Sequence, residues 1–424
     1  MLSVEENELL TRIGPGTPMG DLYRRFWLPI LLAEELPAPD CTPVRVHVLG
    51  EHLIAFKDSD GRVGLLDRRC PHRLADLFWG RNEFGGLRCA YHGWMYDVDG
   101  NCIDLPNAPE GDTFKEKIKT FAAYPAVERG GFVWAYMGPK EAIPEVPDIE
   151  LNSVPASHRY ISKMFIGGNY LQGMEGDMDS SHVGFLHSNI DREDNALTAR
   201  NRMQPAMFQD KAPVWDLKDS PCGIMLGAKR QGEEGRVYWR VNQWLMPSIT
   251  MIAARPGTPI HVQVRVPMDD EHMLYYRVIY HPTRPLTEAE LTDAREAGVN
   301  FPEIIPGTFL PVENKANDYL IDREAQRTKS FTGIKSIPAQ DWAIQEDQGG
   351  PITDRSIEHL VSADSSIIAV RKRLLETVMQ LQEGTEPSEP HSGGKYRVRS
   401  VDLELDASDT VWEGGKEYLE AKAW

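Results

Sequence analysis

Two cysteines and two histidines lie within one stretch of the sequence, RRCPHRLADLFWGRNEFGGLRCAYHGW, residues 68–94. Cys70 precedes His72 by two positions, and Cys89 precedes His92 by three. Cysteine and histidine are common ligands of zinc and of iron–sulfur clusters. A lone cysteine is usually a small buried hydrophobic residue, and a lone histidine is usually a surface or hydrogen-bonded residue. Two such pairs close together instead indicate a metal site.

The spacing of these pairs distinguishes between two kinds of metal site. Structural zinc sites often place two cysteines in one loop and two histidines in another, whereas each loop here offers one of each. This arrangement suits a [2Fe–2S] cluster of the Rieske type, in which two cysteines hold one iron and two histidines hold the other. The sequence therefore predicts a Rieske cluster bound by Cys70, His72, Cys89 and His92, with zinc as the alternative.

A second group of potential ligands lies in NYLQGMEGDMDSSHVGFLH, residues 169–187, which has helical character. Two histidines and one carboxylate on one face of an iron form the facial triad of Fe(II) oxygenases. On a helix, Asp179 and His182 would share a face, but His182 and His187 would lie about 140° apart at 3.6 residues per turn. Both histidines can reach one metal only if the helix ends, bends or widens between them, and Gly184 offers a place for this. The alternative is a solvated acidic helix with incidental histidines.

The elements that would position these groups follow from the hydrophobic pattern. Residues 43–140 contain short apolar runs separated by glycine and aspartate turns, which predicts an all-β domain. The Pro- and acid-rich stretch MGPKEAIPEVPDIELNSVP has the composition of a linker. Beyond it, YWRVNQWLMPSITMIA, IHVQVRVP and HMLYYRVIYH alternate like strands of an antiparallel sheet, and LTEAELTDAREAG and SSIIAVRKRLLETVMQLQEG have helical periodicity. A small β domain followed by a larger α+β domain is expected.

Composition limits the class of protein. The 424-residue chain has a formal net charge of −18 and no basic stripe, which disfavours nucleic acid and anionic membranes as partners. It begins without an apolar signal segment and has no apolar run long enough to span a bilayer, so a cytoplasmic protein is expected. Five cysteines without a regular pattern do not indicate a secreted disulfide framework, and Cys41, Cys102 and Cys222 are interpreted as structural.

With both motifs present, the chain resembles the Rieske non-haem iron aromatic-ring-hydroxylating oxygenases, in their terminal oxygenase (α) component. CPHR and CAYHGW match the cluster motif, and Glu175, Asp179, His182 and His187 match the family pattern E-x3-D-x2-H-x4-H. The segments ENELLTRIGPGTPMGDLYRRFWLPILLAEELP and GPITDRSIEHLVSAD are similar to the phthalate-dioxygenase-like branch, and the similarity covers nearly the whole chain.

This resemblance implies the domain organisation. The fold expected is α+β, with an N-terminal all-β Rieske domain over residues 43–140 and a helix-grip-like catalytic domain with an antiparallel sheet over residues 141–424. Residues 1–42 would form an N-terminal helical and extended segment.

The resemblance also implies the ligands of a mononuclear iron. His182 and His187 would bind it together with a distant carboxylate. In IPAQDWAIQEDQGGPITDRSIEHL, Asp341 followed five residues later by Glu346 matches the register of the corresponding family segment, and Asp347 is the competing candidate.

Asp179 is expected to have a separate role by the same resemblance. It would bridge His92 of one chain to His182 of a neighbouring chain and carry electrons between the two centres, which implies a homo-oligomer, a trimer or a dimer of trimers. A carboxylate that accepts from both imidazoles would also hold both rings in place. The alternative is a structural carboxylate within one chain.

The activity implied is oxidation of a carboxylated aromatic compound by O2, with electrons relayed from NAD(P)H by a separate reductase. Each chain would hold one Rieske cluster and one mononuclear Fe(II), and the reaction would be ring hydroxylation, dihydroxylation or oxidative O-demethylation. No G-x-G-x-x-G motif is present in the chain, in agreement with a reductase on another polypeptide.

A substrate carboxylate would need a cationic partner in the site. Lys229, Arg230 and Arg240 lie on predicted strands and are candidates, although a Lys–Arg pair beside QGEEG is also typical of a solvated hairpin. Two other classes of protein remain as alternatives. One is a Rieske electron-transfer protein without oxygenase chemistry, and the other is a zinc-stabilised binding module.

Overall fold

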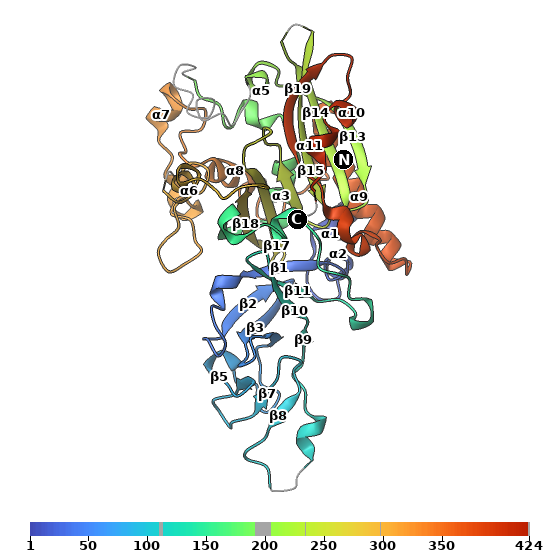
Figure 1. The fold of residues 1–424 in the computed structure, drawn as a ribbon. Coiled ribbons are helices and arrows are strands. Elements are labelled where there is room, and N and C mark those ends of the chain that lie inside the picture. The colour runs from blue at the N-terminus through green and yellow to red at the C-terminus, as the bar shows by residue number, and fades with distance from the viewer. Residues whose placement is uncertain (110–112, 191–204, 234, 297, 423–424) are drawn as a thin grey trace. The chain divides into compact units, whose positions relative to one another are not determined.

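The computed structural model describes residues 1–109, 113–190, 205–233, 235–296 and 298–422 (Figure 1). The chain divides into two compact units. Residues 13–146 form one unit, and residues 1–12 together with residues 147–424 form the other. The division falls inside the Pro- and acid-rich stretch that has the composition of a linker. In the described part of the chain, no helix is long and apolar enough to cross a membrane.

The unit of residues 13–146 consists of small antiparallel sheets, as its short apolar runs predict (Figure 1). One sheet has the order β1 (Trp27–Leu32), β11 (Phe132–Tyr136), β10 (Ala126–Arg129). The second has the order β2 (Val44–Val48), β3 (Glu51–Lys57), β4 (Val63–Asp67), β9 (Ala123–Tyr124). The third has the order β5 (Arg81–Glu83), β6 (Gly86–Arg88), β7 (Met95–Tyr96), β8 (Cys102–Asp104). The helical elements are α2 (Pro18–Tyr23), η1 (Ala33–Glu35), η2 (Leu77–Trp79), η3 (Phe114–Lys117) and η4 (Lys140–Ala142).

The larger unit is built on an antiparallel sheet of eight strands, drawn from the described residues. Seven strands follow the order β12 (Arg159–Gly167), β18 (His272–Tyr280), β17 (Ile260–Pro267), β16 (Ile249–Ile252), β15 (Arg236–Leu245), β14 (Gly223–Gln231), β13 (Val214–Ser220). The eighth, β19 (Val401–Asp406), pairs with the first half of β15, and β16 pairs with its second half. Most residues of β15, β17 and β18 are buried, so these strands are covered on both faces.

Several helices of the larger unit pack against this sheet or against one another. The described helices are α1 (Val4–Thr11), α3 (Tyr170–Met178), α5 (Ala206–Gln209), α6 (Glu288–Arg295), α7 (Arg323–Thr328), α8 (Ile337–Gln345), α9 (Ser365–Gln382), α10 (Val411–Gly414) and α11 (Lys416–Leu419). The short 3-10 elements are η5 (Glu150–Asn152), η6 (Ala156–His158), η7 (His182–Gly184), η8 (Lys315–Leu320), η9 (Ser362–Asp364), η10 (Glu389–His391) and η11 (Gly393–Tyr396). Helix α3 packs on β16 and β17, and α8 and α1 pack against α3.

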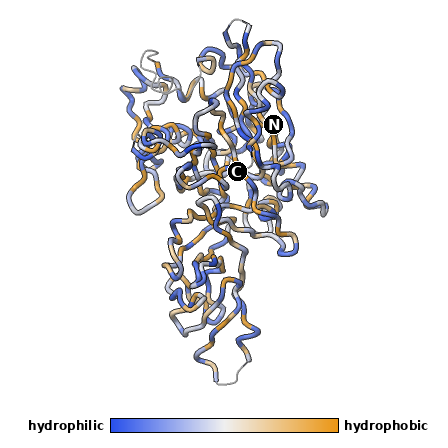
Figure 2. The backbone as a smooth tube through the Cα atoms, in the orientation of Figure 1, coloured by the Kyte–Doolittle hydropathy of each residue, from blue (hydrophilic) through white to orange (hydrophobic). Residues whose placement is uncertain are grey.

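The hydrophobic pattern explains this arrangement. Hydrophobic residues recur along the strands of both units (Figure 2). Helix α9 buries residues at helical spacing, namely Ile367, Val370, Leu374 and Val378. The predicted fold class, an N-terminal all-β Rieske unit followed by an α+β unit with an antiparallel sheet, is confirmed.

Candidate metal centres and active site

The two Cys–His loops, residues 70–75 and 89–94, fold in the same way. In each loop the cysteine N–H donates to the carbonyl oxygen five residues later, at 2.8 and 2.7 Å. The N–H four residues after the cysteine donates to the cysteine carbonyl oxygen, at 2.8 and 3.0 Å. That fourth residue has a left-handed backbone in both loops, with φ of 60° at Leu74 and 79° at Gly93. Glycine is required at position 93 also because a Cβ there would lie 2.7 Å from Pro106 Cγ.

These loops bring their ligands together as two pairs. Cys70 and Cys89 are buried, and the hydrogen bond between the two thiols lowers the pKa of Cys70 to about 6. The rings of His72 and His92 face each other with centroids 4.4 Å apart. The donor atoms of these four side chains do not converge on a point as the ligands of one tetrahedral zinc ion would. A thiol pair beside an imidazole pair fits the two irons of a Rieske cluster.

The surroundings of the two pairs would orient the ligands and tune a cluster. The Tyr96 hydroxyl lies 3.3 Å from Cys70 Sγ. Trp94 stacks on the His72 ring at 4.3 Å, and its Nε1 donates to Asn107 at 2.8 Å. Hydrogen bonds to the sulfurs and burial are among the factors that set the reduction potential of such a cluster.

Helix α3 ends earlier than the sequence pattern predicts. Its last residue is Met178, and Asp179 has an extended backbone. The Asp179 carboxylate accepts the N–H of Ser181 at 2.6 Å and of His182 at 3.3 Å, which stabilises a turn in place of another helical turn. The prediction that Asp179 and His182 share a helical face is therefore wrong. The break comes before His182 and not at Gly184.

The turn that follows carries both histidines toward one point. His182 begins the 3-10 turn η7, and Gly184 ends it. A Cβ at Gly184 would lie 2.7 Å from the Met207 carbonyl oxygen, so only glycine allows this close approach. The rings of His182 and His187 then lie with centroids 5.1 Å apart and nearly perpendicular.

Asp341 on α8 completes this group. Its Oδ1 lies 3.2 Å from His187 Nε2 and 3.7 Å from His182 Nε2, and the donor atoms of the three residues all lie within 4.8 Å of one another. Burial acts to raise the pKa of Asp341, but the imidazoles of His187 and His182 outweigh it and hold the pKa below its ordinary value. The structure does not bring Asp347 to the histidines, because its carboxylate is exposed and pairs with Lys315 Nζ at 2.6 Å.

The outer nitrogens of both histidines face oxygen atoms, so that the inner nitrogens face the metal position. His187 Nδ1 lies 2.7 Å from Gln340 Oε1. The Gln340 amide nitrogen donates to the Ile334 carbonyl oxygen, which identifies Oε1 as the acceptor and places the proton of His187 on Nδ1. Asp179 Oδ2 lies 3.4 Å from His182 Nδ1. Two imidazole Nε2 atoms and one carboxylate oxygen, with the His187 ring held in place by Gln340, fit a mononuclear iron.

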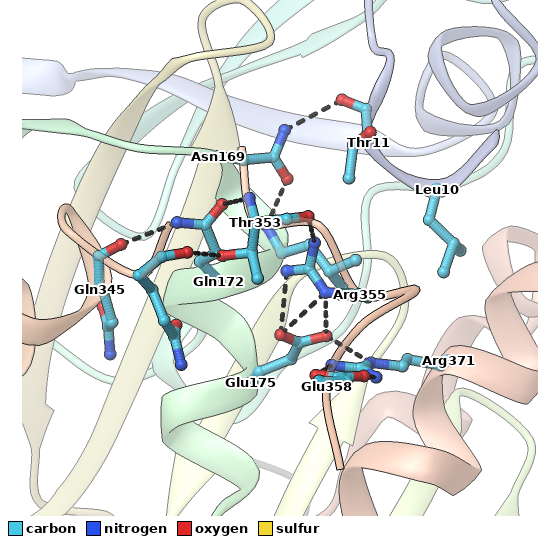
Figure 3. Close-up of polar contacts among 12 residues, drawn as sticks. Leu10, Thr11, Asn169, Gln172, Glu175, Gln345, Thr353, Arg355, Glu358 and Arg371 are labelled. Carbon is cyan, nitrogen blue, oxygen red and sulfur yellow. Dashed lines mark hydrogen bonds and ion pairs between the residues drawn. The ribbon is translucent and has the colours of Figure 1, made fainter. Parts of the chain in front are cut away.

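Buried ion pairs hold α3 in the position that this site requires. Glu175 accepts hydrogen bonds from Arg355, at 3.0 and 2.9 Å, and from Arg371 at 2.6 Å (Figure 3). Arg371 also pairs with Glu358. Burial acts to raise the pKa of Glu175, but Arg355 and Arg371 outweigh it and keep the pKa below its ordinary value. The Glu175 carboxylate is therefore ionised beside the two guanidinium groups. These bonds fix α3 one turn before Asp179.

A cavity of about 260 Å³ opens beside His182, His187 and Asp341. Its wall is mixed: apolar residues come from the sheet and also include Val183, Met207 and Phe301, and cations come from β15, from β18 and from Arg255 in the segment between β16 and β17. The lining includes Val183, Met207, Arg240, Ile252, Gln263, Arg277, Ile279, Asn300 and Phe301.

The sequence and fold match known families at both centres. Residues 26–122 match the model of the Rieske [2Fe-2S] domain, and residues 135–399, more than half of the chain, match the LigXa C-terminal domain like family. The chain belongs to the Rieske non-haem iron oxygenases. It is an oxygenase component of this family, with a [2Fe–2S] cluster and a mononuclear iron as its cofactors, and such components act with reductase partners.

Relatives of this oxygenase are similar over nearly their whole length. It is 38% identical to the phthalate 4,5-dioxygenase oxygenase subunit of Pseudomonas putida over 91% of this chain and 88% of that protein. It is 35% identical to the 3-chlorobenzoate-3,4-dioxygenase oxygenase subunit of Comamonas testosteroni, over 97% of each chain. The crystal structure of dicamba monooxygenase bound to dicamba shares the fold, with a TM-score of 0.59 at 19% identity, covering 85% of this chain and 99% of that one.

The three cations predicted for a substrate carboxylate lie in different places in the oxygenase. Arg240 lines the cavity. Arg230 is buried, but its guanidinium donates to the backbone carbonyl oxygens of Asp210 and Ser180, at 2.8 and 2.6 Å, so it supports the loop before His182. Lys229 does not line the cavity and lies over the Trp239 ring.

Sequence reasoning missed Arg277, which lines the same cavity. It lies in the strand sequence HMLYYRVIY, whose other residues after the first are apolar or aromatic and are buried. A charged residue inside a strand that is buried on both faces is a signal that could have been used, because such a charge needs a partner.

The ion pairs at Glu175 give a prediction about stability. Replacing Glu175 with glutamine leaves two buried guanidinium groups with one carboxylate, and we expect the free energy of unfolding of the larger unit to fall by about 3 kcal/mol. Urea unfolding measures this change. The matched control is Glu376→Gln on the exposed face of α9, where the loss should stay below about 0.5 kcal/mol. Equal effects of the two substitutions would contradict the argument.

The choice between the two aspartates gives a second prediction. Asp341→Ala should lower the iron content from about three to about two atoms per chain, because it removes a ligand of the mononuclear iron and leaves the cluster in place. Metal analysis together with the visible absorption of the cluster measures this. Asp347→Ala serves as the control and should retain all the iron. Loss of iron from the Asp347 variant alone would show that the register is wrong.

Proposed function

We propose that this oxygenase oxidises an aromatic compound that carries a carboxylate, by ring hydroxylation, dihydroxylation or oxidative O-demethylation. The observation that carries the proposal is Arg240, which is 9% exposed and lines the cavity beside the metal position. Within the described residues Arg240 forms no ion pair, and its one hydrogen bond is a long contact of 3.4 Å to Ser180 Oγ. A buried guanidinium without a carboxylate is poised to bind one.

The names of the relatives support the same class of substrate. The subunits that are 38% and 35% identical act on phthalate and on 3-chlorobenzoate, as their names state. A third relative, 33% identical over 91% of this chain, is the 5,5'-dehydrodivanillate O-demethylase oxygenase subunit of Sphingobium sp..

The residues of the cavity would divide the work of binding. Arg240 would bind the substrate carboxylate with two parallel hydrogen bonds and so fix the direction of the ring. Ile252, Ile279 and Phe301 offer apolar surface to the ring and exclude water from it. His182, His187 and Asp341 would hold the iron. When bound, the iron and the cluster would supply the chemistry of O2 activation and of one-electron transfer.

Asp179 is proposed to connect two chains of a homo-oligomer, a trimer or a dimer of trimers. It lines the first cavity and also a second one, of about 220 Å³, beside Ile344 and Glu358. Ile344, which lines this second cavity, is exposed. Ile357 and Val361 are exposed too, and each is adjacent in the sequence to a residue that lines this cavity. These apolar side chains favour a protein partner there.

The Rieske unit offers a surface of matching chemistry. Around its two Cys–His loops the side chains of Leu74, Trp79, Phe84 and Tyr91 are exposed. We propose that this surface of a neighbouring copy binds at the second cavity, so that His92 of that copy donates to Asp179. The carboxylate would then be a shared hydrogen-bond partner of two ligand histidines.

Asp179→Asn tests this connection. The amide retains the size of the side chain but loses the charge that binds two imidazoles, so we expect full iron content, an unchanged oligomer and turnover lower by about 100-fold. Iron analysis, light scattering and the rate of reoxidation of the reduced cluster measure these three properties. Normal reoxidation in this variant, or a wild-type chain that is monomeric at working concentration, would refute the connection.

The proposed activity is tested with a panel of benzoates, phthalates and methoxybenzoates, supplied with a reductase from a related system. We expect substrate-stimulated O2 uptake with hydroxylated or demethylated product for at least one acid, and none for its methyl ester. Arg240→Gln should raise KM by about 10-fold to 100-fold, because this is the loss of affinity that corresponds to the free energy of a hydrogen bond to a charged group. The control is Arg236→Gln on the same strand, which pairs with Asp406 outside the cavity. Turnover of neutral aromatics alone would refute the proposal.

A further inference from the structure

We propose that Arg277 binds a second acidic group of the substrate, so that this oxygenase prefers aromatic dicarboxylates to monocarboxylates. The inference rests on the proposed function, because it concerns the same cavity and the same class of aromatic acid.

Arg277 is a buried cation that forms no ion pair with any residue the structure describes. Its side chain belongs to β18, is 7% exposed and lines the cavity. Across the described parts of the chain it makes no ion pair and no hydrogen bond, and its Nε is buried without a partner. A charge in a protein interior is costly when it has no ion-pair partner. A ligand anion is the direct way to offset this cost.

Two acidic residues of the cavity wall, Glu290 and Asp293, are engaged with other groups. Glu290 binds the Arg284 guanidinium with two bonds of 2.8 Å. Asp293 accepts a hydrogen bond from Asn300 at 3.3 Å. Neither forms an ion pair with Arg277, and this leaves the guanidinium available to the cavity.

The position of Arg277 separates it from Arg240. Arg277 pairs in register with Gln263 of β17, whose side chain also lines the cavity, and its guanidinium carbon lies 5.5 Å from the Phe301 ring centroid. Strands β16 and β17 lie between β18 and the β15 strand that carries Arg240, a spacing of about 14 Å across the sheet. One carboxylate is not expected to bind both guanidinium groups, whereas a ring with two carboxylates can bind one at each.

Neutralising Asp341 is the alternative role for Arg277. Burial acts to raise the pKa of Asp341, and Arg277 is the weakest of the charges that oppose this, after those of His187 and His182. No ion pair joins the two side chains. If support of Asp341 were the main role, replacing Arg277 would release the mononuclear iron.

The test measures equilibrium binding to the oxidised holoenzyme under anaerobic conditions, so that turnover plays no part. Isothermal titration calorimetry gives Kd for benzoate and for the three isomeric benzene dicarboxylates. With the wild-type protein we expect at least one dicarboxylate to bind at least tenfold more tightly than benzoate. In Arg277→Gln that advantage should fall to less than threefold, while Kd for benzoate changes by less than threefold.

Three further variants make the result specific. Arg277→Lys keeps the charge and should retain part of the advantage, and Arg240→Gln should lose it as Arg277→Gln does. Arg236→Gln should bind like wild type. Loss of mononuclear iron in Arg277→Gln, or an equal loss of affinity for benzoate and dicarboxylate, would overturn the inference.

Binding to the wild-type protein distinguishes failure of the dicarboxylate preference from failure of the proposed function. If the wild-type protein binds benzoate and the dicarboxylates equally, the inference fails and the proposed function stands. If it binds none of the benzoates, phthalates and methoxybenzoates of the larger panel, the proposed function fails and the inference fails with it.

Discussion

The larger unit depends on one constraint, which is that three carboxylates within five residues must each find a partner. They are Glu175, Asp177 and Asp179. They lie on or directly after a helix that is buried against the sheet, and each needs its own positive or N–H partner. Glu175 binds two arginines, and Asp177 binds Arg265 of β17. Asp179 instead accepts backbone N–H groups and faces His182. These partners come from different elements, so they fix both the rotation of α3 and the residue at which it ends.

The end of α3 determines the metal site. If the helix continued through Asp179, the two histidines would point in different directions, as the helical geometry shows. The turn at Asp179 brings them side by side, and α8 supplies Asp341 from a segment more than 150 residues further along the chain. Gln340, its neighbour on α8, orients His187 from behind. One short helix thus supplies a ligand and also the group that orients another ligand.

Much of this could be predicted from the sequence because the signals are local. Two cysteines and two histidines in close pairs predict a cluster, and alternating apolar strands predict the antiparallel sheet. The end of α3 could not be predicted, because Asp179 can either continue a helix or capture N–H groups of the next turn, and only its surroundings decide. Asp341 and Asp347 have equivalent chemistry in the sequence. The family register favours Asp341, and in the folded chain Lys315 binds Asp347 and leaves Asp341 beside the histidines.

The cations of the cavity illustrate the same difference between local and long-range signals. Lys229 and Arg230 are adjacent in the sequence and attract attention, but the alternation of a strand sends their side chains to different surroundings. Arg240 and Arg277 are separated by 37 positions and line the same cavity only because β15 and β18 belong to one sheet.

The electrostatics of the whole chain show why burial of these two cations matters. A net charge of −18 repels an anionic substrate at a distance, although salt screens this effect beyond about 8 Å at physiological ionic strength. Attraction must therefore arise inside the cavity, where solvent screens charges much less. Guanidinium groups that are already desolvated and not paired with the many carboxylates of the chain can provide it. Arg240 and Arg277 meet both conditions, whereas surface arginines such as Arg236 have carboxylate partners.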